Sequence, residues 1–232
     1  MQARTILVAA VGLLLAAALP ATADMILTVK CTTEEATVFQ EFQIPCSGGA
    51  VDWTLPSPVE IMDGSVWLAR IKDLGIQSDL EPYVNLRFAV EAGASDTTFD
   101  ISSAIVGFGP LSNPQAYASG GVTLTSDSDG ATITGLFGGM NYEARYNSSI
   151  VFADLVGGFS ISGDQTVTRS DRKPGSGYDT ITGTLSSIES QFKFILSAMD
   201  QASGTSRFEV VPEPATMSLL ALGGLALIRR RR

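Results

Sequence analysis

The stretch Tyr83-Val84-Asn85-Leu86-Arg87-Phe88-Ala89-Val90-Glu91 carries the clearest structural signal in this chain of 232 residues. Its apolar residues Val84, Leu86, Phe88 and Val90 occupy every second position, and Asn85, Arg87, Ala89 and Glu91 stand between them. A period of two in β-forming residues is typical of a strand that is buried on one face only. The stretch therefore predicts a strand with one face in a core and the other in solvent.

Runs with a similar composition recur through residues 24–211, roughly every 10–15 residues. Further strands are predicted at 25–30, 37–44, 65–71, 97–106, 121–125, 131–137, 142–152, 179–185, 191–198 and 206–211. Turn-forming sequences such as Asp127-Ser128-Asp129-Gly130 separate them. The helical features expected are a short turn near Glu189–Gln191 and local helix at Glu34–Val38. This pattern predicts an all-β fold, an antiparallel two-sheet β-sandwich of jelly-roll type, flanked by apolar processing segments at both ends.

The N-terminal segment, residues 1–23, has the three parts of a secretory signal peptide. Arg4 supplies a positive charge, an apolar run follows from Ile6 to Leu19, and Ala21-Thr22-Ala23 has the small residues that a signal peptidase accepts. The run is 14 residues long, about 21 Å as a helix, which is short for a bilayer core of ~30 Å. We expect cleavage between Ala23 and Asp24; an uncleaved membrane helix is the alternative.

The C-terminal segment, residues 212–232, also has three parts. Pro212-Glu213-Pro214 is followed by a short apolar stretch to Ile228 and by four arginines, Arg229–Arg232. Two prolines hold the backbone extended, as a peptidase substrate requires. The apolar stretch favours insertion into the inner membrane as a helix during export, and the arginines favour the cytoplasmic side.

This tail resembles the PEP-CTERM sorting signal of Gram-negative bacteria, over about 21 residues and with all parts in order. The resemblance implies that an exosortase is the processing partner and that Pro212, Glu213 and Pro214 are its recognition residues. It also implies export to the cell surface or extracellular matrix of bacteria that make exopolysaccharide and biofilm. A plain C-terminal membrane anchor is the alternative, although Gly223, Gly224 and the shortness of the apolar run would make it a poor one.

The remaining body, residues 24–211, suits a single domain. It contains 10 Lys+Arg and 23 Asp+Glu, a net charge of −13, which argues against nucleic acid as a partner. The chain contains no histidine. This excludes ordinary Ser-His-Asp and Cys-His catalysis and, with two cysteines in total, a conventional zinc site.

Cys31 and Cys46 are the two cysteines of the chain, and both lie in the part expected to be exported. Disulfides form in such oxidising compartments. A bridge between them would close a loop of about 15 residues and stabilise the fold by ~3 kcal/mol. We therefore expect a structural Cys31–Cys46 disulfide within an early hairpin.

Asp127, Asp129 and Gly130 resemble the opening of a calcium loop. The next acidic residue, Glu143, does not close the loop at the required spacing, so an Asp-Gly hairpin turn is the favoured interpretation. Apart from this weak calcium candidate we expect no metal, no cofactor and no catalytic residues.

Aromatic residues could include a platform on which sugar rings stack. The candidates are Trp53, Trp67, Tyr83, Tyr117, Tyr142, Tyr146 and Tyr178. In a sandwich most aromatic side chains belong to the core, which is the competing interpretation. Acidic residues are numerous, but no pair of carboxylates is marked out for glycoside hydrolysis.

Three hypotheses for the function follow. The first is a non-enzymatic structural or interaction protein of the cell envelope or extracellular matrix, associated with exopolysaccharide or with other surface proteins. The second is a carbohydrate-binding module, and the third, less favoured, is a hydrolase of matrix glycans. A groove with two facing carboxylates would favour the hydrolase, and an aromatic strip would favour the binding module.

Overall fold

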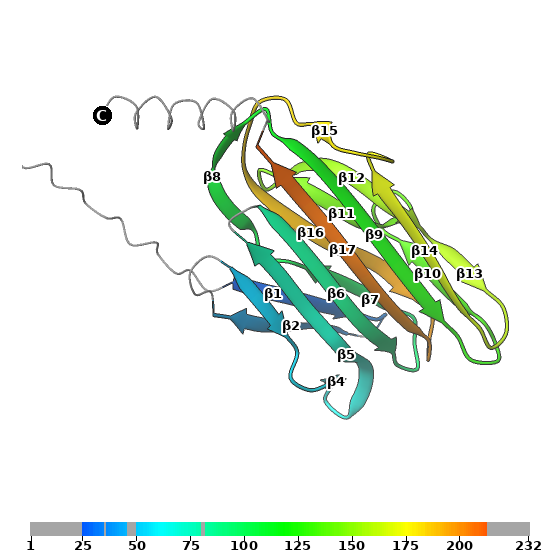
Figure 1. Ribbon diagram of the computed structural model, residues 1–232. Coiled ribbons are helices and arrows are strands. Elements are labelled where there is room, and N and C mark those ends of the chain that lie inside the picture. The colour runs from blue at the N-terminus through cyan, green and yellow to red at the C-terminus, as the bar shows by residue number, and fades with distance from the viewer. Residues whose placement is uncertain (1–24, 35, 46–49, 80–81, 213–232) are drawn as a thin grey trace, which may run out of the picture.

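The computed structural model describes residues 25–34, 36–45, 50–79 and 82–212, and all its regular elements are strands. They form two antiparallel sheets packed face to face, which we call sheet one and sheet two and describe in turn below. In Figure 1, sheet two lies in front of sheet one. The predicted all-β, two-sheet antiparallel sandwich is confirmed. Within the described residues, no helix with the length and apolar character needed to cross a membrane is present.

Sheet one runs in the order β12-β11-β16-β7-β1-β2, with β8 and β10 beside β16 and β13 beside β10. Its strands are β1 (Met25–Thr32), β2 (Thr37–Ile44), β7 (Thr97–Ser102), β8 (Val106–Ser112), β10 (Ala131–Gly135), β11 (Met140–Tyr146), β12 (Ile150–Gly157), β13 (Phe159–Ile161) and β16 (Thr184–Leu196). The expected helical turn at Glu189–Gln191 is wrong, because these residues pair with β11 in the middle of β16.

Sheet two runs in the order β14-β9-β17-β6-β5-β3, with β15 beside β9 and β4 beside β5. Its strands are β3 (Val51–Thr54), β4 (Val59–Asp63), β5 (Val66–Asp79), β6 (Tyr83–Ala92), β9 (Gln115–Thr125), β14 (Thr166–Lys173), β15 (Asp179–Thr180) and β17 (Gln201–Val211). The chain passes repeatedly from one sheet to the other, so strands distant in sequence become neighbours.

The core lies between the two sheets and is rich in aromatic rings. Phe88 of β6 lies 4.8 Å from Phe192 and 5.5 Å from Phe194 of β16, measured between ring centroids. Tyr142 of β11 lies 4.9 Å from Phe192 and is fully buried. Such ring contacts add to the hydrophobic stabilisation that burial supplies.

The alternation predicted for Tyr83–Glu91 is present in β6. Val84, Leu86, Phe88 and Val90 are at most 2% exposed and point into the core. The polar residues between them lie on the outer face of sheet two. The same alternation in β9 and β17 gives this sheet a continuous outer surface of polar and small side chains.

Candidate functional site

A groove of about 790 Å³ runs over the outer face of sheet two. Its lining comes from six strands and from the segment that follows β14: Asp52, Trp53, Gly75, Ile76, Gln77, Asn85, Leu86, Arg87, Ser119, Gly120, Gly121, Ser170, Asp171, Arg172, Gly175, Thr205, Ser206 and Arg207. Small-molecule pockets are mostly apolar, whereas this lining is mostly polar. The groove therefore suits a ligand rich in hydroxyl or charged groups.

One cross-strand row of small residues forms the floor of the groove. Ser170, Gly121 and Thr205 are consecutive partners on β14, β9 and β17. The row continues through Arg87 of β6 to Gly75 of β5. A Cβ on Gly75 would lie 2.6 Å from Nε of Arg87, so the glycine gives the arginine room to lie across the sheet.

The next row, two residues along each strand, is a chain of hydrogen-bonded polar side chains. Arg207 Nη1 donates to Asn85 Oδ1 at 3.4 Å, Asn85 Nδ2 donates to Gln77 Oε1 at 3.4 Å, and Gln77 Nε2 donates to Asp52 Oδ1 at 3.2 Å. At its other end Arg207 Nε donates to Glu209 Oε2 at 2.7 Å. We call Arg207, Asn85, Gln77 and Asp52 the polar ladder. It offers planar amide, guanidinium and carboxylate groups side by side over β17, β6, β5 and β3.

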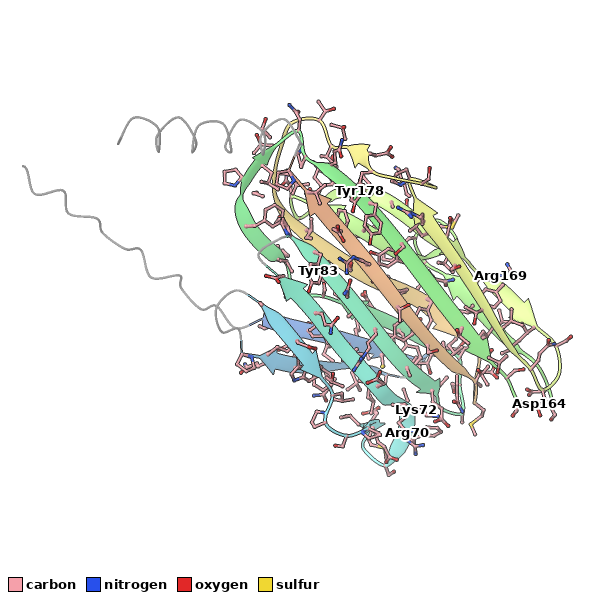
Figure 2. The ribbon with its side chains drawn as sticks, viewed as in Figure 1. Arg70, Lys72, Tyr83, Asp164, Arg169 and Tyr178 are labelled. Carbon is pink, nitrogen blue, oxygen red and sulfur yellow. The ribbon has the colours of Figure 1, made fainter. Side chains whose placement is uncertain are left out.

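Three tyrosines gather along one side of the groove, next to Arg207. The guanidinium of Arg207 lies 4.6 Å from the ring centroid of Tyr83, and Arg172 lies 4.9 Å from that of Tyr117. Tyr117 and Tyr178 meet edge to face at 5.2 Å. In Figure 2, Tyr83 and Tyr178 lie toward one end of this face, and Arg70 and Lys72 lie toward the other.

The hydroxyls of Tyr117 and Tyr178 remain protonated near neutral pH. Burial raises the pKa of Tyr117 above its usual range. A hydrogen bond from Tyr178 Oη to Glu209 Oε1, 2.9 Å long, raises the pKa of Tyr178. Tyr117 can therefore donate a hydrogen bond to a sugar hydroxyl beside an apolar ring, whereas the Tyr178 hydroxyl already donates to Glu209 and can only accept.

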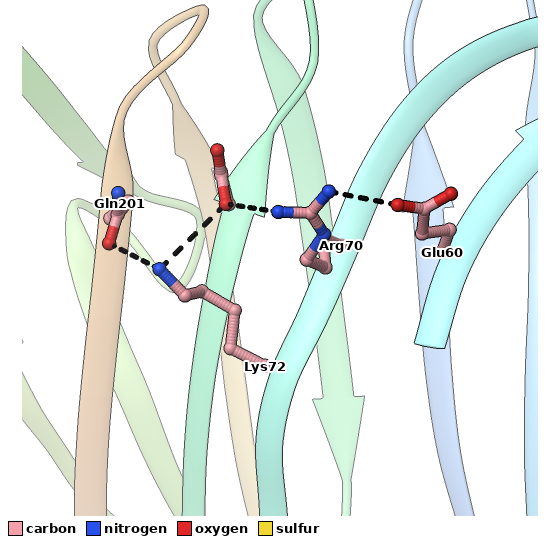
Figure 3. Close-up of polar contacts among 5 residues, drawn as sticks. Glu60, Arg70, Lys72 and Gln201 are labelled. Atoms are coloured by element: carbon pink, nitrogen blue, oxygen red, sulfur yellow. Dashed lines mark hydrogen bonds and ion pairs between the residues drawn. The ribbon is translucent and has the colours of Figure 1, made fainter. Parts of the chain in front are cut away.

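The far end of the same face carries an ion-pair network outside the groove. Arg70 Nη2 lies 2.8 Å from Glu60 Oε1, and Arg70 Nη1 lies 3.4 Å from Glu91 Oε2 (Figure 3). Lys72 Nζ donates to Gln201 Oε1 at 2.8 Å. These contacts join β4, β5, β6 and β17 across the sheet, and their side chains are already paired with one another.

The aromatic residues named from the sequence separate into two groups. Tyr83, Tyr117 and Tyr178 come together beside the groove, and Trp53 lines it. Tyr142 belongs to the core, where burial raises its pKa to about 12 and its hydroxyl lies 2.9 Å from Ser190 Oγ. Tyr146 also packs against the core, and Trp67 lies outside the groove lining.

Sequence reasoning missed the polar ladder. The outward positions of Asn85 and Arg87 were visible from the alternation in β6. Their partners Gln77 and Arg207 lie on strands whose register the sequence does not give. The ladder forms because β17, the last strand of the body, lies between β6 and β9 in the sheet and pairs with both.

Cys31 is a buried free thiol in the structure, and burial raises its pKa to about 12. Cys46 lies outside the described residues, so the expected disulfide stays a prediction. The register of the β1–β2 hairpin argues against this bridge. Cys31 is opposite Val38, whereas Ile44 is opposite Met25, which lies six residues or ~20 Å from Cys31 along β1. Two residues of chain beyond Ile44 span at most ~7 Å, and bridged Cα atoms lie within ~7 Å of each other.

Asp127 and Asp129 lie in an exposed turn between β9 and β10. The expected hairpin is wrong, because these two strands belong to different sheets and do not pair with each other. The amide of Asp129 donates to Asp127 Oδ1 at 3.1 Å, and Gly130 has a φ of 92°, a value that favours glycine. The structure places a third carboxylate, Asp200, beside them.

Of the processing sites, Pro212 follows β17 directly. Ala23, Asp24, Glu213 and Pro214 lie outside the described residues. Near the last strand end, the amide of Val210 donates to the carbonyl of Pro82 at 2.8 Å, which fixes the end of β17 beside the start of β6. The tail therefore leaves the sandwich on the side of the groove where the tyrosines lie, close to Glu209.

Comparison with known proteins supports the interpretation of the tail. Residues 210–232 match the PEP-CTERM protein-sorting motif. The protein is therefore exported and sorted by an exosortase, to the cell surface or the extracellular space of a bacterium. A search of curated proteins found no match to the chain.

Two solved structures of infectious bursal disease virus resemble the chain weakly. The Gx strain structure is 10% identical over 89% of this chain and 54% of its own, with a TM-score of 0.29. The Gt strain structure is 10% identical over 84% of this chain and 65% of its own, with a TM-score of 0.22. The chain thus spans between half and two thirds of the length of the viral chains that it matches.

Proposed function

We propose that this protein is a non-enzymatic component of the cell surface or extracellular matrix that holds polysaccharide in the sheet-two groove. The observation that carries the proposal is the polar ladder from Arg207 to Asp52, which lies beside the tyrosine cluster. Planar polar side chains bind neighbouring hydroxyl groups through pairs of hydrogen bonds, and tyrosine rings cover the apolar faces of sugars. The sorting signal supports the proposed association with biofilm exopolysaccharide, and other surface proteins are the alternative partner.

The open form of the groove supports a polymeric ligand. It crosses the strands of sheet two from β14 to β3, so a polysaccharide can enter and leave at both edges of the sheet. Arg87, Arg172 and Arg207 line it together with Asp52 and Asp171. The groove is thus less acidic than the body as a whole, whose net charge is −13.

The carboxylates of the groove favour binding over hydrolysis. Asp52 lies on β3 and Asp171 on β14, at opposite edges of the main sheet. Five strand spacings separate these edges, which is ~24 Å of sheet. Glycosidases hold their two carboxyl groups ~5–9.5 Å apart, so this pair cannot flank one glycosidic bond.

Binding of matrix polysaccharide to the full chain and its variants tests the proposal. Polysaccharide extracted from the producing cells is the first probe, measured by affinity electrophoresis and pull-down. Arg207→Ala removes the guanidinium end of the ladder, next to the tyrosines, and we expect affinity to fall about tenfold or more. Gly121→Gln places a side chain on the groove floor, where a Cβ makes ordinary contacts of 3.7–3.9 Å, and we expect a similar loss without loss of folding.

Lys72→Ala is the matched control, because Lys72 is a paired polar residue on the same face but outside the groove. Equal binding by all three variants would place the ligand elsewhere on the molecule. No binding by the unaltered chain at millimolar saccharide would remove the polysaccharide proposal and favour a protein partner.

A further inference from the structure

Three carboxylates from two distant parts of the chain meet at one end of the sandwich. Asp127 and Asp129 lie in the β9–β10 turn, and Asp200 lies in the turn between β16 and β17. One oxygen atom from each lies within 4.8 Å of the other two. Asp127 and Asp129 are exposed, whereas Asp200 is 2% exposed.

Asp200 is fixed in place by its neighbours. Its amide donates to the carbonyl of Ser197 at 3.4 Å, and its own carbonyl accepts from the amide of Ala92 at 3.0 Å. Its Oδ2 accepts a hydrogen bond from Ser197 Oγ. These backbone bonds fix the position of the residue, and the carboxylate cannot turn out into solvent without losing the hydrogen bond from Ser197.

The second oxygen of Asp200 has no partner. Oδ1 is buried and forms no hydrogen bond. A buried carboxylate oxygen without a donor is unfavourable unless a proton or a cation compensates it. The charged groups acting on it are Asp129, Asp127 and Asp96, which all repel it, and burial together with them raises the pKa of Asp200.

We infer that Asp127, Asp129 and Asp200 form a calcium-binding site. Ca²⁺ binds oxygen ligands at ~2.3–2.6 Å, so two ligand atoms of one ion lie at most ~5.2 Å apart. The three oxygens here, within 4.8 Å of one another, meet that limit. Mg²⁺ binds at 2.0–2.1 Å in a near-ideal octahedron, and zinc prefers nitrogen and sulfur ligands. The half-open position of the cluster leaves room for waters to complete the coordination shell.

The site would join turns that are about seventy residues apart in sequence. Asp96, whose Oδ1 accepts from the amide of Ala198 at 3.1 Å, connects a third loop to the same turn. A Ca²⁺ ion here would offset part of the repulsion among four neighbouring carboxylates. It would also link the two sheets, because β9 and β17 belong to sheet two and β10 and β16 to sheet one.

Calcium titration of the full chain by calorimetry, at pH 7 after removal of metal with chelator, tests the site. We expect saturable binding of one Ca²⁺ with a Kd of about 10⁻⁴–10⁻³ M, as in extracellular modules, and much weaker binding of Mg²⁺. At about ten times the Kd, the melting temperature should rise by roughly 3–6 °C. Absence of saturable binding up to ~10 mM, well above that range, or equal affinity for Mg²⁺, would overturn the inference.

Two variants separate a ligand role from a structural one. Asp200→Asn should abolish the calcium-dependent rise in melting temperature while leaving the chelator-treated protein at least as stable as the unaltered one. The double variant Asp127→Asn, Asp129→Asn alters exposed side chains only and should also abolish it. Asp164→Asn, an exposed loop carboxylate, is the control and should keep it. Retention of the calcium effect in both cluster variants would place the ion elsewhere and refute the site.

Discussion

Gly204 of β17 faces the ring of Phe88 of β6 so closely that a Cβ at position 204 would lie 2.4 Å from a ring carbon. The two residues are register partners on the inner face of sheet two. Phe88 cannot retreat, since its ring contacts Phe192 and Phe194 of the opposite sheet. Because Gly204 has no side chain, the ring of Phe88 has room to pack at the centre of the core.

Replacement of this glycine tests that packing. We expect Gly204→Ala to lower the free energy of unfolding by about 1–3 kcal/mol, because a methyl group would overpack the core against Phe88. Gly121→Ala is the control: its Cβ meets nothing closer than 3.7 Å, and its effect should stay within ~0.5 kcal/mol. Urea unfolding midpoints measure both, and equal midpoints would show that the sheets separate easily at this point.

Glu189 gives the fold a dependence on pH. Burial raises its pKa, the charge of Asp100 adds to the rise, and Arg145 opposes it. The folded state then holds the proton more tightly than the unfolded chain, so this contribution to stability is complete below the unfolded pKa and is lost as the pH rises through the folded pKa. We expect Glu189→Gln to be more stable than the unaltered protein at pH 7.

The difference between Glu189→Gln and the unaltered protein should vanish below about pH 4, where both side chains are neutral. Urea midpoints from pH 3 to pH 8 measure it. Asp164→Asn, in an exposed loop, provides the comparison for a simple change of net charge. A constant difference between Glu189→Gln and the unaltered protein at all pH values would contradict the assignment to this titration.

The thiol of Cys31 should be protected by the fold alone. We expect alkylating reagents to leave it unmodified in the native protein and to modify it after denaturation without any reductant, because it is a buried free thiol. Peptide mass analysis locates the label. A requirement for reductant before labelling would instead establish the disulfide with Cys46, and Cys46→Ser would then cost ~3 kcal/mol of stability.

The sorting tail should be processed close to the end of β17. We expect the mature protein outside the inner membrane to begin at Asp24 and to end near Pro212–Pro214, as intact mass will show. Replacing Pro212, Glu213 and Pro214 by alanine should leave Arg229–Arg232 on the protein and keep it in the inner membrane. Release of that variant in processed form would contradict recognition at these residues.

The position of the tail has a consequence for binding in the groove. Pro212 follows β17 directly, and Glu209, three residues earlier, accepts the hydrogen bond of Tyr178. Whatever holds the processed C-terminus therefore lies next to the tyrosine cluster. Polysaccharide bound in the groove would be retained close to the attachment point.

Local sequence determined the strand character of this protein and its cellular route. The alternation in Tyr83–Glu91 sets which side chains face the core, because successive residues of a strand point to opposite faces. The sorting motif is likewise a contiguous segment, and it is recognisable from residues 210–232 alone. Turn residues such as Gly130 were also visible, since their backbone conformation depends on the residue itself.

Only the tertiary structure decided which strands become neighbours, and both candidate sites depend on this. Arg207 reaches Asn85 because β17 pairs with β6, although 122 residues separate the two side chains. Asp200 joins Asp127 and Asp129 because the ends of β9, β16 and β17 meet at one end of the sandwich. Pairing register depends on the packing of the whole core rather than on local propensity, so the sequence contained these residues without revealing that they lie together.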